Sequence, residues 1–227
     1  MSGGALSFAR AVLVRDLATS IRSGGGWFYA ILFFAVFAAL AGIAIGPELS
    51  ALAGAAPAIN WLAAAFAIQL TVADAFEADF RDGSLAVLAA EQDSLFPYFF
   101  AKVALVGLTA AVPMVVASPV VMTMFGVAPA HLIGSAILLA FGAPALVLTA
   151  LFAAALAAGL RAGGVLAVVI AAPFLAPPLI FGVLSIETYI EQGVFWSPET
   201  FILAALSLFM TALTPPFSVI ALRLGLE

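Results

Sequence analysis

The residues that could do chemistry gather in one stretch, Glu77 to Asp93, with the sequence EADFRDGSLAVLAAEQD. It is the longest charged run in a chain that is otherwise apolar, and long apolar segments flank it on both sides. Because charged side chains are costly to remove from water, this run must be solvated. We therefore predict a polar loop, held at a membrane face, that receives a partner protein.

The middle of this loop has the signature of a turn followed by a short helix. Gly83 permits a tight turn, and Ser84 can accept a hydrogen bond from the free amides that begin a helix over 85–91. Two leucines would then share one side of that helix, as in a small docking helix. The residues that we expect to carry docking are Asp79, Arg81, Asp82, Gly83, Ser84, Leu85, Leu88 and Glu91.

Asp74, Glu77 and Lys102 form a possible polar cluster near the same loop. The two acids are three residues apart on one helical face, and Lys102 has a similar depth on the next apolar segment. Ionisable groups inside a membrane often mark a transport path, and these three could pair across the helices. The simpler interpretation, which we favour, is that they reach the interface by snorkelling or form a structural ion pair.

Several chemistries are excluded by missing motifs. The chain has no P-loop sequence, no His-Glu-x-x-His motif and no cysteine, which excludes a P-loop ATP site, thiolate metal sites and disulfides. His131 is the single histidine; it could be an axial haem ligand, but a lone histidine at the end of an apolar segment is more often a surface residue. We expect a non-catalytic chain that binds no cofactor or metal directly.

Composition identifies the elements that must position the loop. Of 227 residues 66% are hydrophobic and only 8% charged, with a mean hydropathy of +1.27. A soluble domain cannot expose so little polar surface, so the sequence predicts an all-α integral membrane protein. Prolines at 173, 177 and 178 predict a break in the fifth span. We also expect a short external helix within 187–199. The six predicted spans are 27–46, 57–77, 97–125, 130–159, 164–186 and 200–222.

Charge sets the orientation. The seven cations are Arg10, Arg15, Arg22, Arg81, Lys102, Arg161 and Arg223. With six crossings and the N-terminus inside, all of them lie on or near the cytoplasmic side, and so does the C-terminus. The opposite side receives Glu48, Glu187, Glu191, Glu199 and His131. The aromatic residues that we place at span ends, where amphipathic rings prefer to lie, are Trp27, Tyr29, Trp61, Tyr98, Tyr189 and Trp196.

The N-terminal residues 5–22 have an amphipathic helical pattern. One face carries Leu6, Ala9, Leu13, Leu17 and Ile21, and the opposite face Arg15, Asp16, Thr19 and Arg22. We favour an interfacial helix over a disordered basic tail. Residues 1–26 are then an interfacial helix and its glycine-rich elbow, and residues 27–227 a single six-span domain with its coupling loop at 77–95.

Two longer motifs stand out: the loop sequence Asp79-x-x-Asp82-Gly83-Ser84-Leu85, and Gly159-Leu160-Arg161-Ala162-Gly163-Gly164-Val165-Leu166. Shorter ones are Ile45-Gly46-Pro47-Glu48, Ala101-Lys102-Val103, Leu213-Thr214-Pro215-Pro216-Phe217 and Ala221-Leu222-Arg223. Taken together, these motifs resemble the haem exporter protein B (CcmB) family, and the resemblance covers essentially the whole chain.

The resemblance implies a permease-like subunit of an ABC-type complex in cytochrome c biogenesis, in the bacterial inner membrane. Two copies would pair with two copies of an ATPase, CcmA, which binds the ATP, and with the membrane proteins CcmC and CcmD. The short helix after Gly83 would be a coupling helix, through which ATP hydrolysis frees the haem-loaded chaperone CcmE. Nothing in the chain suggests a nucleic-acid partner.

Three other functions fit the residues alone. The first is an ordinary permease of the ABC-2 type that exports a lipid, a glycan or a drug. The second is a stand-alone carrier, although the absence of a mid-span carboxylate gives proton-coupled transport little support. The third is a passive assembly scaffold.

Overall fold

The computed structural model describes residues 3–22, 26–73, 75–90, 95–160 and 163–226, and all regular structure in these ranges is helical. Within them six helical stretches are long and apolar enough to cross a membrane, as the composition predicts. They are α2 (Gly26–Ile45), α3 (Leu49–Val72), the run of α6 (Leu95–Val106), the π-helical turn η1 (Gly107–Ala111) and α7 (Val112–Met124), then α8 (Pro129–Ala157), α9 (Gly163–Gln192) and α10 (Pro198–Leu224).

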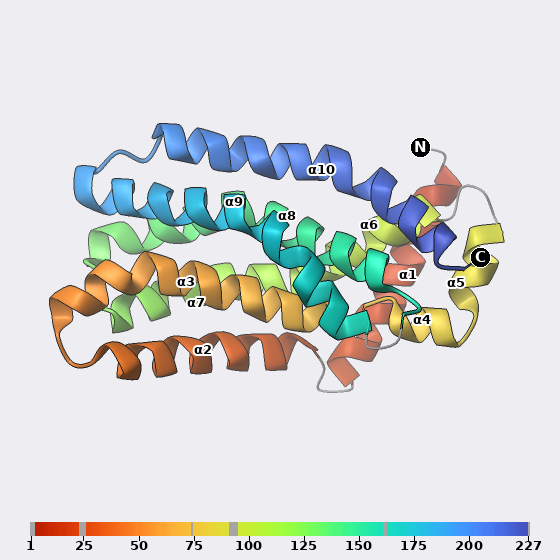
Figure 1. The fold of residues 1–227 in the computed structure, drawn as a ribbon, viewed down its shortest axis with the longest axis horizontal. Helices are drawn as coiled ribbons and strands as arrows, with labels where there is room; N and C mark the ends of the chain where they lie inside the picture. Colours follow the sequence, from red (N-terminus) through yellow and green to blue (C-terminus); the bar gives the residue numbers. More distant parts are fainter. Residues whose placement is uncertain (1–2, 23–25, 74, 91–94, 161–162, 227) are drawn as a thin grey trace.

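The spans lie side by side along the long axis of the molecule (Figure 1). Three further helices, α1 (Gly3–Arg22), α4 (Glu77–Arg81) and α5 (Ser84–Ala90), lie at the end of the bundle that also holds both chain termini. We call this the terminal end. There α1 runs across the bundle rather than along it, as expected for a helix at a membrane surface.

The spans differ in how deeply they are buried. Among their most apolar windows, 72% of the α8 residues are buried inside the protein, against 17% in α2 and 22% in α9. The centre of the bundle is therefore α8, on which α7, α9 and α10 pack. The least buried spans, α2 and α9, present apolar side chains outwards, such as Ile43 on α2 and Val165 and Val169 on α9.

Two glycines make room for a tryptophan at the centre of the bundle. The ring of Trp61 on α3 is fully buried, and a methyl group at Gly142 of α8 or at Gly182 of α9 would overlap it. We call these three residues the tryptophan contact. The predicted interfacial position of Trp61 is wrong, because α3 begins at Leu49 and not at residue 57. The stretch before Pro57 continues the helix, which places Trp61 well inside the span.

The predicted break in the fifth span is also wrong. Helix α9 continues through its three prolines to Gln192, which leaves no external helix in the short connection to α10. Figure 1 shows that α9 bends without breaking. A proline removes one backbone hydrogen bond and bends a helix, but packing against neighbouring helices keeps such spans intact in membrane proteins. Three of the other four predicted connections lie close to their predicted positions, and the first is shorter than predicted because α3 already begins at Leu49.

Candidate docking site and the polar ring behind it

The charged loop folds into two short helices with a tight turn between them. Gly83 has φ +77°, a left-handed conformation that favours glycine, as the sequence predicts. The predicted capping role of Ser84 is wrong, because Asp82 takes it: Oδ1 of Asp82 accepts the backbone N–H of Ser84 at 2.9 Å. Hydrogen bonding from the Ser84 side chain, and to a smaller extent from the Ser84 backbone N–H, holds the pKa of Asp82 below its ordinary value.

The helix that we expected to carry docking, α5, exposes a different side from the one predicted. Leu85 is completely buried and Leu88 is partly buried against the hydrophobic core, so the side of α5 that carries them faces the protein. Their burial is what holds this seven-residue helix on the bundle. The exposed side of α5 consists of Ala86, Val87 and Ala90, and 66% of Val87 is exposed.

Charged residues beside this face are also exposed. Nη2 of Arg81 pairs with Oε1 of Glu77 at 2.8 Å, one helical turn back, and Asp82 is open to solvent. Glu91, which we expected to take part in docking, lies outside the described residues, as does Asp74. We call the exposed residues Arg81, Asp82, Ala86, Val87 and Ala90 the docking face.

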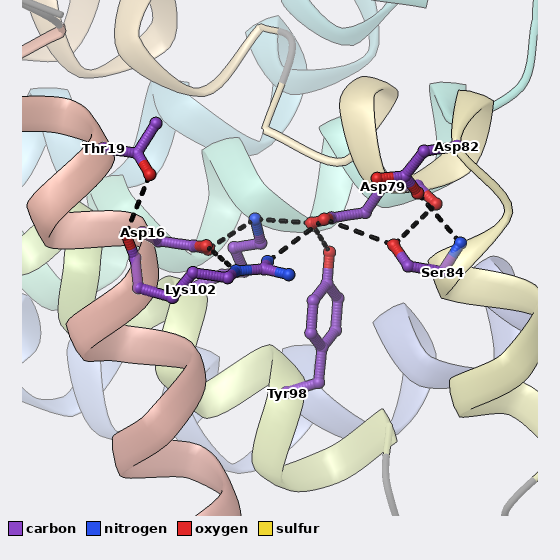
Figure 2. Close-up of polar contacts among 8 residues, drawn as sticks. Asp16, Thr19, Asp79, Asp82, Ser84, Tyr98 and Lys102 are labelled. Atoms are coloured by element: carbon purple, nitrogen blue, oxygen red, sulfur yellow. Dashed lines mark hydrogen bonds and ion pairs between the residues drawn. The ribbon is translucent and has the colours of Figure 1, made fainter.

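Behind the docking face, four charged side chains form a closed ring (Figure 2). Nζ of Lys102 lies 2.9 Å from Oδ2 of Asp16 and 2.8 Å from Oδ2 of Asp79. Arg15 completes the ring, with Nε 2.8 Å from Oδ1 of Asp16 and Nη2 3.2 Å from Oδ1 of Asp79. Two cations thus face two anions, and each cation contacts both. We call these residues the polar ring.

Neighbouring hydroxyl groups hold Asp79 in the ring. The phenol of Tyr98 on α6 donates to Oδ2 of Asp79 at 2.6 Å, and the hydroxyl of Ser84 donates to its backbone oxygen at 3.2 Å. The Asp79 and Lys102 side chains are only 9% and 8% exposed. The ring therefore connects α1, α4 and α6, and Ser84 adds the first residue of α5.

Two expectations are corrected by this arrangement. Asp79 is a buried anchor, not a surface docking residue, because α4 turns that side of the helix towards α6. Lys102 forms a structural ion pair, which is one of the two interpretations that we favoured, but its partners are Asp16 and Asp79 and not Glu77. Tyr98 lies near the start of its span, as predicted, with its ring buried and its hydroxyl bonded to Asp79.

A cavity of about 430 Å³ opens beside the ring, between α1, the end of α3, α4 and α6. The four ring residues line it together with threonine and serine hydroxyls, and Leu105 and Val106 supply part of its apolar wall. A polar space of this size has room for water molecules at the charged groups. The hydrogen bond that Arg15 donates to Asp16 raises the pKa of the guanidinium above its ordinary value, so Arg15 stays charged.

A second contact fixes α4 from the other side. Gly159 follows α8 with φ +77°, and a methyl group there would overlap the ring of Phe80. A side chain at Gly163 would collide with the backbone oxygen of Ala157 and come close to Glu77. The glycines of the Gly-Leu-Arg-x-Gly-Gly motif thus let the turn between α8 and α9 approach α4.

Sequence reasoning missed the roles of Arg15, Asp16 and Tyr98. The available signal was Lys102, the only lysine of the chain, which lies within the apolar run that opens the third span. A buried ammonium needs a carboxylate partner. The amphipathic face that carries Arg15 and Asp16 offered one, but only the crossing of α1 over α6 shows which carboxylates are used.

His131 lies far from the ring, at the end of the bundle opposite the termini. Its imidazole packs edge-on against the ring of Tyr189, with 5.3 Å between centroids. Among the described residues, no group of three or more histidine, aspartate or glutamate side chains is arranged to hold a metal ion.

Comparisons with known proteins identify the family of the chain. The family model described as CcmB protein matches residues 7–225. Heme exporter protein B of Bradyrhizobium diazoefficiens is 36% identical over 217 residues, which cover 96% of this chain and 98% of the relative. The protein of the same name from Rhodobacter capsulatus is 35% identical over 96% of this chain and 100% of its own length, and that from Paracoccus denitrificans 34% identical over the same shares.

Proposed function

The chain belongs to the CcmB protein family, and from that membership we propose that it is the membrane subunit of a haem exporter whose docking face receives a separate ATPase. Haem is then the cargo of the complex, and the chain itself is non-catalytic. In this proposal ATP hydrolysis by a CcmA-type subunit moves α5, and the motion releases a haem-loaded chaperone of the CcmE type in cytochrome c biogenesis.

The observation that carries this proposal is the exposed face of α5. A short helix that leaves Val87 two-thirds exposed beside Arg81 and Asp82 suits insertion into a groove of another protein. The buried leucines keep the helix on the bundle, so force applied to the exposed side reaches the spans.

The proposed orientation places the terminal end in the cytoplasm of a bacterial inner membrane. Positively charged residues concentrate on the cytoplasmic side of membrane proteins, and the terminal end holds α1, α4 and the end of α10 with their arginines. CcmC and CcmD are the expected membrane partners, in a complex that holds two copies of this chain.

The test is co-purification of the ATPase with tagged protein in a mild detergent. Val87→Asp puts a charge on the docking face without touching the core, so we expect loss of the ATPase from the complex and loss of cytochrome c assembly. Leu224→Asp, on an equally exposed leucine of the same end, is the matched control and retains both. Retention of the ATPase by Val87→Asp would overturn the assignment of the docking face.

A second candidate function, export of a lipid-like substrate by an ABC-2 type permease, is favoured by a groove of about 680 Å³. It lies between the α6–η1–α7 run and α8, with apolar side chains such as Leu108, Val112 and Val147 along it. A bulky side chain at Gly107, such as Gly107→Leu, would fill the groove. If the groove carries the cargo, Gly107→Leu should abolish cytochrome c assembly. Normal cytochrome c assembly in Gly107→Leu would favour the force-transmitting role.

A further inference from the structure

We propose that the polar ring is a positioning device that makes the N-terminal helix part of the docking apparatus. In this arrangement Arg15 and Asp16 of α1 hold α4, and through it α5, in the position that a partner meets. The inference deepens the proposed function and rests on α5 being the docking helix. It assigns a role to α1 beyond lying on the membrane surface.

The docking helix needs an external support. At seven residues α5 is too short to be stable alone, and α4, which precedes it, has five. Only one side of α5 packs on the protein, through Leu85 and Leu88. The position of the pair of helices therefore depends on how α4 is fixed, and the residue that α4 buries is Asp79.

The ring gives Asp79 a geometry that one ion pair would not. A single pair can rotate about its contact, whereas Asp79 is held by Lys102 at one oxygen and by Arg15 at the other. Both of those cations also contact Asp16, so neither can follow Asp79 without leaving its second partner. Because opening the ring would leave the largely buried Asp79 or Lys102 without a charged partner, the closed arrangement resists displacement.

The ring also defines two routes for motion imposed on α5. Lys102 lies on α6, which opens the third span, and α1 is followed in the chain by α2, the first span. The first span is the least buried of the six, so it has the fewest contacts to oppose a shift. We infer that displacement of α5 reaches α1 and the third span together, because one ring connects α4 to both.

The distance between α1 and α5 measures this role directly. The chain has no cysteine, so Val14→Cys and Val87→Cys give two unique attachment points for spin labels, both on exposed side chains outside the ring. In the complete protein in lipid nanodiscs, double electron–electron resonance is expected to show one narrow distance distribution. Lys102→Met, which opens the ring, should replace the narrow peak with a broad distribution.

Three companion variants separate positioning from general destabilisation. Lys102→Arg keeps the charge and should restore the narrow peak. Asp16→Asn weakens the ring from the α1 side without touching the loop, so it should broaden the peak even if Lys102→Met fails to fold. Arg81→Ala breaks a surface pair of similar length next to α5 and should leave the peak narrow.

A narrow peak in both Lys102→Met and Asp16→Asn would overturn the inference. So would equal broadening by Arg81→Ala, because the ring would then be no more important than a surface pair. The measurement needs no ATPase, so its failure leaves the proposed function standing. Conversely, if Val87→Asp retained the ATPase while the ring variants broadened the peak, the ring would position the loop but the proposed docking role would be wrong.

Discussion

The tryptophan contact and the polar ring hold helices together by opposite means. The tryptophan contact joins α3, α8 and α9 through shape, with an aromatic ring fitted against two glycines. The ring joins α1, α4 and α6 through charge, at distances of 2.8 to 3.2 Å. Lipid supplies no hydrophobic force between spans, so close packing must join them, whereas a helix crossing at the membrane surface can be fixed by charge. The comparison shows that this chain uses shape at the centre of the bundle and charge for the elements next to the proposed docking face.

The largest expected effect comes from opening the polar ring. Lys102→Met should lower the free energy of unfolding by about 3–5 kcal/mol, because two carboxylates lose their buried cation. Thermal unfolding in detergent would measure it, with Lys102→Arg as the control. A loss no larger than that of Arg81→Ala would show that the ring is as weak as a surface pair.

The next effect breaks the packed side. Gly182→Ala places a methyl group where the Trp61 ring lies, and overpacking of this kind costs about 1–3 kcal/mol. Gly193→Ala is not a suitable control because its φ is +70°, so Gly54→Ala, with open space around it, serves instead. An unchanged unfolding temperature for Gly182→Ala would mean that α9 can move away from Trp61.

A smaller effect sharpens the account of the ring. Arg15 is 53% exposed, so water screens its charge, and Arg15→Ala should cost less than about 1 kcal/mol. Its expected consequence is local: faster hydrogen exchange of the α4 and α5 amides, measured by mass spectrometry, with unchanged exchange in α8. Exchange that accelerates throughout the bundle would contradict a purely local role.

The smallest effect concerns pH. Because the pKa of Asp82 is lowered in the folded protein, its cap stabilises α5 above the ordinary aspartate value of 3.8 and is lost as the pH falls through the lowered value. The protection factors of the α5 amides, which correct for the intrinsic slowing of exchange in acid, should therefore fall on acidification, and Asp82→Asn should weaken that dependence. An unchanged pH dependence in Asp82→Asn would assign it to another group.

Much of the candidate site followed from local sequence. The turn at Gly83 depends on one residue type, and the short helix after it depends on a capping group within two residues, so both were predictable. The identity of the cap was not, since Asp82 and Ser84 have similar capping tendencies and only their geometry separates them. Leu85 and Leu88 were correctly placed on one side of α5, but that side faces the protein.

The sequence by itself determined that this is a six-span membrane protein with one charged loop, because hydropathy summed over about 20 residues is a property of composition. Only the tertiary structure decided which way each polar side chain points. Successive residues of a helix are about 100° apart, so a small rotation moves a side chain such as Asp79 from solvent to a buried ring. That rotation is set by packing against α1 and α6, whose residues lie far away in the chain.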